Sequence, residues 1–221
     1  MERCKYENSP FCSSLSPEDR AAICPHCRPF AFKRHADAQA SCKAVASTLE
    51  PNVPRCVVIL EGLLCTNSSR NAEDPKVFLL WQPGDIMRAE LVFDIVDDLS
   101  PLYHSNYMLD GAYALFPAQV FKDRFMTHPD FAAQLFKSVT KTRLRQTSFL
   151  FGTRLQDAKS ALMYLLLFCE ENGMPALTHQ DFAYLTGLNR TTVTKTLKQI
   201  LAGENLSISL KDYIRSMYED G

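Results

Sequence analysis

A group of hydroxyl and cationic residues near position 190 has the composition and spacing of a nucleic-acid-binding surface. Residues 189–195 read Asn-Arg-Thr-Thr-Val-Thr-Lys and contain no carboxylate. On a helix, one face would carry Arg190, Thr191, Thr194, Lys195 and Lys198. Arginine and lysine pair with guanine acceptors in the major groove, and threonine offers base edges a hydroxyl and a methyl group. The pattern indicates a DNA-reading face, and the alternative is a solvated face on a helix pair that binds nothing.

Local start signals predict two short helices that would position this face. Thr178 and Asp181 have capping-box spacing at the start of the first helix, which we expect to end at Gly187. Asn189 is a favourable N-cap for the second helix. The apolar stripe of the second helix consists of Val193, Leu197, Ile200 and Leu201. The sequence therefore predicts a helix-turn-helix with a tight glycine turn.

The segment TGLNRTTVTKTLKQI, residues 186–200, resembles the recognition segment of the CRP/FNR superfamily of bacterial transcription regulators. The resemblance covers residues 155–203 well and most of the chain weakly. It implies an α+β protein with an N-terminal jelly-roll-like β-barrel similar to a cyclic-nucleotide-binding domain, a long dimerisation helix and a C-terminal winged helix-turn-helix. The implied parts are residues 1–116, 117–152 and 153–221.

The resemblance also implies roles for individual residues. Base edges would be read by Arg190, Thr191, Thr194 and Lys195. The residues expected at phosphates are Thr178, His179, Thr192 and Lys198. Asn189 is a further expected DNA-binding residue. Thr191 and Lys195 stand where many members carry Glu and Arg, so the usual half-site preference does not transfer. The implied partners are a palindromic operator in double-stranded DNA, a second copy of the chain, and RNA polymerase.

The composition is that of a globular protein, with 221 residues, 46% hydrophobic residues and a net charge of −1. A charge near zero excludes a generally cationic nucleic-acid binder, so any DNA contact must come from a local patch. No Ser-His-Asp set, paired acidic motif or phosphate loop is discernible, so the sequence predicts no enzyme. The longest apolar run, residues 162–169, is too short to span a bilayer. We therefore expect no membrane partner and a cytoplasmic location.

Half of the eight cysteines crowd the beginning of the chain, at Cys4, Cys12, Cys24 and Cys27. Dense thiolates can hold an iron–sulfur cluster or zinc, and Cys24 and Cys27 form a CxxC pair around His26. The spacings differ from the compact cysteine group of the family's oxygen sensors. We therefore expect thiols without a ligand role, and an iron–sulfur or zinc/thiol redox sensor is the alternative function.

Runs of β-branched and aromatic residues between positions 29 and 117 predict strands at VVILEG, VFLLWQPGDI, ELVFDIV and YMLDGAYALF. In family members that bind cyclic nucleotides, a Gly-Glu step precedes an arginine that meets the phosphate. Here Ala89-Glu90 is followed by no Arg or Lys through residue 121, which leaves Arg88 as the nearby cation. Because a buried phosphate needs a cation, we expect that cyclic AMP is not the effector. Arg88 and Glu90 are the candidate residues for binding an effector. No histidine stands in a setting distinctive of a haem ligand.

A helical period begins at Pro117, and residues 130–152 predict one helix of about six turns. Four residues of this helix have a/d-like spacing: Val139, Thr142, Gln146 and Phe149. We expect them to form the seam with a second copy of the chain. The alternative is a single helix lying across its own barrel. Gly152 is the expected hinge before the DNA-binding part. After Gly203 no clear hairpin turn follows, so we expect the family's β-wing to be shortened or replaced by a helix.

Overall fold

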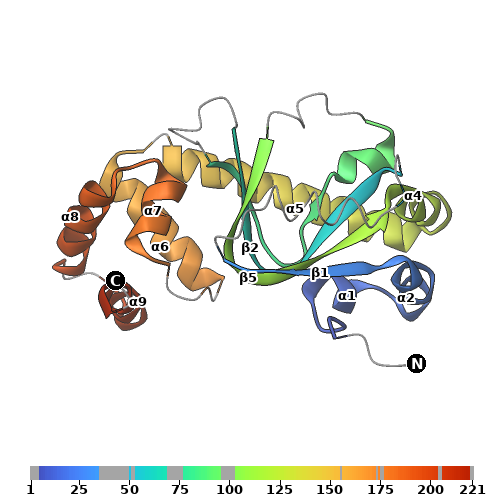
Figure 1. Cartoon of the computed structure of the whole chain (residues 1–221), viewed down its shortest axis with the longest axis horizontal. Helices are drawn as coiled ribbons and strands as arrows, with labels where there is room; N and C mark the ends of the chain where they lie inside the picture. The colour runs from blue at the N-terminus through green and yellow to red at the C-terminus, as the bar shows by residue number, and fades with distance from the viewer. Residues whose placement is uncertain are drawn as a thin grey trace. The chain divides into compact units, whose positions relative to one another are not determined.

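The chain folds into two compact units. The computed structural model describes residues 5–34, 50, 53–68, 77–95, 103–154, 156–172, 174, 177–203 and 206–219. Residues 1–67 and 80–144 form the first unit, and residues 68–79 and 145–221 form the second. The boundary at residue 144 lies inside the long helix α5 (Pro129–Arg154), which is seen in Figure 1. In the described part of the chain, no helix is both long and apolar enough to span a membrane.

A five-stranded sheet, most of which belongs to the first unit, has the strand order β1-β5-β2-β3 with β4 paired to β2. The strands are β1 (Arg28–Phe32), β2 (Arg55–Ser68), β3 (Val77–Trp81), β4 (Ile86–Met87) and β5 (Tyr103–Pro117). β1 is antiparallel to β5, and β4 is antiparallel to β2. The predicted strands at VVILEG and YMLDGAYALF are confirmed, and VFLLWQPGDI forms β3, a turn and the start of β4.

The predicted strand at ELVFDIV is wrong. Residues Ala89–Phe93 form the 3-10 helix η2, in which the N–H of Asp94 donates to the carbonyls of Glu90 and Leu91. Arg88 and Asp94 flank η2 with φ values of 59° and 58°, in the left-handed region. Two left-handed residues six positions apart interrupt an extended backbone, so the apolar residues pack from a short helix instead of from a strand.

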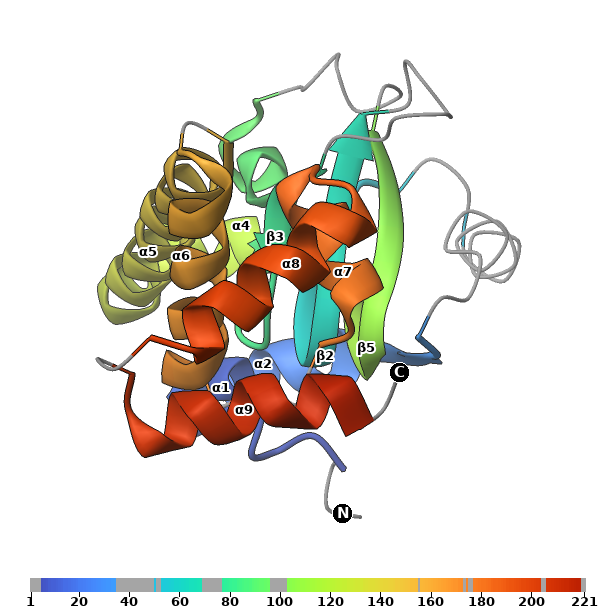
Figure 2. The ribbon, with the colours of Figure 1, turned by 90° about the vertical axis from the view of Figure 1, so that its left-hand side faces the viewer.

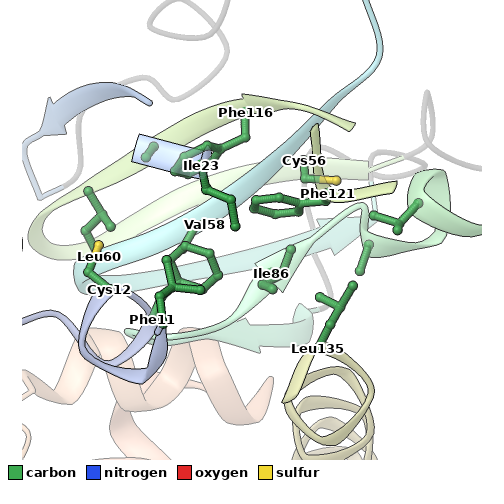
Figure 3. Packing of buried hydrophobic residues seen from close by; sticks show 14 of the residues in the cluster. Phe11, Cys12, Ile23, Cys56, Val58, Leu60, Ile86, Phe116, Phe121 and Leu135 are labelled. Carbon is green, nitrogen blue, oxygen red and sulfur yellow. The ribbon is translucent and has the colours of Figure 1, made fainter. Parts of the chain in front are cut away.

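The core of the first unit packs the sheet against short helices (Figure 3). The helices are α1 (Pro10–Ser14), α2 (Pro17–Ile23), the 3-10 helix η1 (Cys24–His26) and α4 (Ala118–Thr127). Phe11 lies 5.9 Å from Phe116 and 5.8 Å from Phe121, measured between ring centroids. Ser16 caps α2: its side chain accepts a hydrogen bond from the N–H of Asp19.

The second unit gathers four further helices, which Figure 2 shows together. They are α6 (Ala158–Glu171), α7 (His179–Thr186), α8 (Arg190–Leu201) and α9 (Ile208–Glu219). The buried apolar residues of α6 include Ala161, Leu162, Leu165 and Leu166. Contacts join α6 to each of the other three helices. The core of this unit is therefore built around α6.

The described residues after Gly203 form a helix instead of a β-wing. Ser207 begins α9, and its hydroxyl accepts a hydrogen bond of 3.1 Å from the N–H of Leu210. Leu210, Ile214 and Met217 are buried and lie at helical spacing. One apolar face of α9 therefore packs into the second unit.

Helix α5 confirms the predicted long helix, but the expected dimer seam is wrong. Thr142 and Gln146 are buried within the single chain. Val139 packs against the core of the first unit, and the ring of Phe149 lies 6.3 Å from that of Phe168 in the second. The face of α5 that carries these four residues therefore packs against its own chain and not against a second copy.

Two other features of α5 were not expected. Gly152 lies within the helix, and a Cβ on it would come 2.4 Å from Cγ of Tyr164, so this glycine serves close packing and not a hinge loop. Phe136, Leu144 and Phe151 are exposed by 65%, 66% and 54%. Spaced eight and seven residues apart, they form an apolar stripe on the other side of α5.

Candidate nucleic-acid interface

The first helix of the pair, α7, begins with the predicted capping box. The hydroxyl of Thr178 accepts a hydrogen bond of 3.2 Å from the N–H of Asp181. In return, Oδ2 of Asp181 accepts hydrogen bonds of 2.8 Å from the N–H and 2.7 Å from the hydroxyl of Thr178. Leu177 and Phe182 are both buried, as expected for a hydrophobic staple. These contacts fix where α7 begins.

The turn between α7 and α8 requires a glycine. Gly187 has φ +72°, and its N–H donates to the carbonyl of Ala183. Nη1 of Arg154 donates a 2.9 Å hydrogen bond to the carbonyl of Thr186, and a Cβ on Gly187 would lie 2.0 Å from that nitrogen. Asn189 then caps α8, since its Oδ1 accepts from the N–H of Thr192 at 2.7 Å. The elbow is therefore fixed on both sides.

Helix α8 has one buried and one outer face. Val193, Leu197 and Ile200 are buried, whereas Leu201 is half-buried. The exposed residues on the outer side include Asn189, Arg190, Thr191, Lys195 and Lys198, and the half-buried ones are Thr192 and Thr194. The structure thus brings the sequence-predicted DNA-binding residues of α8 together on its outer side. A surface with hydroxyls and cations and without carboxylates suits phosphates and base edges.

His179 differs from the exposed phosphate contact that the sequence predicts. It is 9% exposed, and its Nδ1 shares a hydrogen bond of 3.0 Å with the hydroxyl of Thr194. Its ring meets the ring of Tyr218 edge to face, with 4.6 Å between centroids. Burial lowers the pKa of His179, and the charges of Arg190 and Lys198 lower it further. The imidazole is therefore favoured in its neutral form.

A cavity of about 490 Å³ lies beside His179. Its lining consists of Thr178, His179, Gln180, Arg190, Thr194, Lys198, Met217 and Tyr218. Sequence reasoning missed Met217 and Tyr218, because it did not place the C-terminal segment against the helix pair. The signal available was the helical spacing of Leu210, Ile214 and Met217.

A second cavity, of about 200 Å³, lies in the first unit. Its lining consists of Trp81, Ile86, Ala89, Glu90, Phe93, Ile95, Val139, Thr142 and Arg143. Nη2 of Arg143 lies 4.0 Å from Oε2 of Glu90. Arg88 is exposed and is not part of this lining, so the structure brings Glu90 together with Arg143 and not with Arg88. Sequence reasoning missed Arg143, since no local signal links residues so far apart.

Solved structures of transcription regulators share this arrangement of elements. A regulator of the CRP/FNR family from Thermus thermophilus matches with a TM-score of 0.54 and 19% identity, over 86% of this chain and 100% of that one. The chain has the CRP/FNR fold. The c-di-GMP responsive global regulator CLP of Xanthomonas campestris matches with a TM-score of 0.60 and 14% identity, over 85% of this chain and 92% of that one. The fold implied by the resemblance is confirmed.

The global nitrogen regulator of Synechocystis is similar in sequence to part of the chain. The two are 29% identical over 106 residues, and the match covers 43% of this chain and 47% of that protein. The match thus spans about half the length of that regulator. No protein-family model matches the chain.

Three of the four N-terminal cysteines, for which metal binding was the alternative, lie in the described part of this CRP/FNR fold. Cys4 lies outside the described residues, Cys12 is buried in the core, and Cys24 and Cys27 are half-buried around η1. Among the described residues, no group of three or more His, Cys, Asp or Glu could hold a metal ion. Burial raises the pKa of Cys56 to about 12 and that of Cys169 to about 11, which keeps both thiols protonated.

Proposed function

We propose that the chain is a sequence-specific DNA-binding transcription regulator of the CRP/FNR type that acts as a homodimer. The observation that carries the proposal is the outer side of α8, where exposed Arg190 and Lys195 stand on a capped helix behind a fixed glycine turn. In a helix-turn-helix, the N-terminal part of the second helix enters the major groove. Arg190, Thr191, Thr194 and Lys195 would read base edges there.

Phosphate contacts would come from the residues that flank this reading face. Thr178 and His179 lie at the start of α7, and Asn189 and Thr192 lie at the start of α8. Lys198 extends the positive charge along α8 by two turns from Arg190. Contacts of this kind set the register of a protein on the duplex without reading its sequence.

The second copy would pair along the apolar stripe of α5, formed by Phe136, Leu144 and Phe151. Large apolar side chains that are more than half exposed at heptad-like spacing are typical of a helix awaiting a partner helix. The same stripe on a second copy covers it with twofold symmetry. The two recognition helices could then bind half-sites about one turn, or roughly 34 Å, apart on the DNA.

An effector would bind in the cavity between η2 and α5 in the first unit. The lining is largely apolar, and its charged groups are Glu90 and Arg143. We therefore propose a small, mostly apolar effector with one polar group that pairs with Glu90 or Arg143. Because Arg143 adjoins Leu144 of the stripe, such a ligand would bias the pairing of the two α5 helices. Trp81 is the chain's single tryptophan and lines the cavity, so its fluorescence would report ligand binding.

The experiment that tests the proposed function is selection of bound fragments from genomic DNA, followed by gel shifts with purified variants. Arg190→Ala and Lys195→Ala are each expected to weaken binding to the selected fragments at least about fivefold, since one good base contact contributes about 1–3 kcal/mol. Lys159→Ala, which removes an exposed cation of α6, serves as the matched control and should bind like the parent chain. Equal binding by all variants would contradict the proposal.

A further inference from the structure

The buried imidazole of His179 has one nitrogen satisfied and one unsatisfied. Its Nδ1 is held by the hydroxyl of Thr194, whereas its Nε2 has no hydrogen-bond partner among the described residues. Buried polar atoms are seldom left in this state, and such an atom often marks a ligand site. The edge-to-face ring of Tyr218 lies against the imidazole.

The cavity beside His179 has the chemistry of an anion site. Its described lining includes two cations, Arg190 and Lys198, the amide donor Gln180, and no carboxylate. The start of α7 also contributes the positive end of a helix dipole. The nearest acid on α7 is Asp181, whose Oδ2 is engaged by the N–H and hydroxyl of Thr178.

We propose that this cavity receives a backbone phosphate of the bound DNA, and that His179 takes up a proton from solvent as the phosphate binds. Binding of DNA by this chain would then be coupled to proton uptake at one residue of each copy. The inference rests on the proposed function, since it assumes that a duplex lies against α8. According to this inference, His179 makes DNA binding depend on pH, which a phosphate contact without a change of protonation would not do.

The electrostatics of the cavity give the direction of this coupling. In the unbound protein, burial is the largest cause that lowers the pKa of His179, followed by Arg190 and Lys198. The groups that bear on the ring are these two cations of α8 and the Tyr218 phenol of α9. A phosphate would offset both cations and pair directly with an imidazolium, so it would raise the pKa of His179.

The hydrogen bonds are compatible with both protonation states. In the neutral ring, Nδ1 bonds to the hydroxyl of Thr194, and Nε2 is the nitrogen left without a partner among the described residues. An imidazolium donates from both nitrogens, so Nδ1 would donate to the Thr194 hydroxyl and Nε2 to a phosphate oxygen. Tyr218 holds its place through ring contact and a hydrogen bond of 3.5 Å from its hydroxyl to the carbonyl of Thr194. A bond this long is weak, so a small shift of Tyr218 would cost little.

The test is the affinity of the intact chain for a selected duplex between pH 6 and pH 8 at constant ionic strength. Affinity should rise as the pH falls, by up to about tenfold per pH unit for each copy that gains a proton. His179→Gln should flatten this dependence, and His26→Gln, at an exposed site on η1, should retain it. An equally steep dependence in His179→Gln would overturn the inference. Thermal unfolding of each variant verifies that it is folded.

A direct reading comes from the proton resonances of the His179 ring, followed by NMR across the same pH range. The pKa of His179 should lie below its ordinary value in the unbound chain and should increase when the duplex is added. A pKa that is unchanged or lower with the duplex would contradict the inference alone. If no duplex binds at any pH, the proposed function fails, and this inference fails with it.

Discussion

The hydroxyl of Thr142 in α5 donates a 2.7 Å hydrogen bond to Oδ1 of Asp85, in the turn before β4, and both side chains are buried. The other carboxylate oxygen of Asp85 accepts a 2.9 Å hydrogen bond from the N–H of Gln82. A turn of the sheet is thereby tied to the helix that carries the apolar stripe. Since Thr142 also lines the effector cavity, a ligand there would bear directly on this link.

Removing this link should destabilise the first unit. Thr142→Val keeps the shape of the side chain but leaves Oδ1 of Asp85 without this donor, at a cost of about 1–3 kcal/mol in the free energy of unfolding. Urea unfolding followed by Trp81 fluorescence measures the change in this unit. Thr140→Val, at an exposed position of the same helix, is the control and should change stability by less than about 0.5 kcal/mol. Equal stability of the two variants would show that the bond contributes little.

Acid should weaken the contact between α2 and α4. Burial acts to raise the pKa of Asp19, but hydrogen bonds from Ser16 and Arg124 and the charge of Arg124 outweigh burial and lower the pKa below its ordinary value of 3.8. Because the folded pKa is lowered, the carboxylate stabilises the fold fully above pH 3.8 and loses this contribution as the pH falls towards the folded pKa. In Asp19→Asn this acid-dependent loss should disappear.

Unfolding free energies measured from pH 6 to pH 2.5 test this prediction. The difference between the parent chain and Asp19→Asn should shrink as the pH falls. Asp123→Asn, at an exposed site on α4 next to Arg124, should keep the acid-side slope of the parent chain. A difference that stays constant over the whole range would mean that Asp19 has no lowered pKa.

A charge in the apolar stripe should dissociate the dimer. Leu144→Glu places a carboxylate between two α5 helices, where it would be desolvated and face its symmetry mate. Sedimentation velocity should show a dimer for the parent chain and a monomer for Leu144→Glu at the same micromolar concentration. Gln134→Glu adds the same charge to an exposed position away from the stripe and should remain dimeric. A dimeric Leu144→Glu would place the contact elsewhere.

Two cations of α8 should affect DNA binding in different ways. Lys198→Ala should weaken binding to all sequences alike, and the slope of affinity against salt should fall by about 0.9 for each copy, as for one lost phosphate contact. Arg190→Ala should instead relax the preference for one base pair in each half-site. Binding titrations at several salt concentrations, with the selected site and a one-base variant, separate these effects. Identical behaviour of the two variants would be inconsistent with the proposed roles.

The sequence predicted the helix pair well because its signals are local. Thr178, Gly187 and Asn189 specify the ends of two helices through contacts within four residues, and all three positions are confirmed. Chemistry within one turn of chain is readable without knowledge of the tertiary structure.

Features that depend on distant contacts were predicted less well. Helix α5 has apolar residues on two sides, and periodicity alone does not tell which side packs on its own chain, so the seam was assigned to the buried side. Arg143 meets Glu90 from a separate element, and Tyr218 reaches His179 from the last helix. Each pairing is set by how elements pack, which no local pattern in the sequence encodes.

The most direct test of the central claim is methylation interference on DNA fragments selected by the intact chain. The account predicts that N7 methylation blocks binding at two groups of guanines, about one helical turn apart. For Arg190→Ala, methylation of one guanine in each group should no longer interfere with binding. Failure to select any sequence, or a pattern that Arg190→Ala leaves unchanged, would contradict the claim that the outer side of α8 reads DNA.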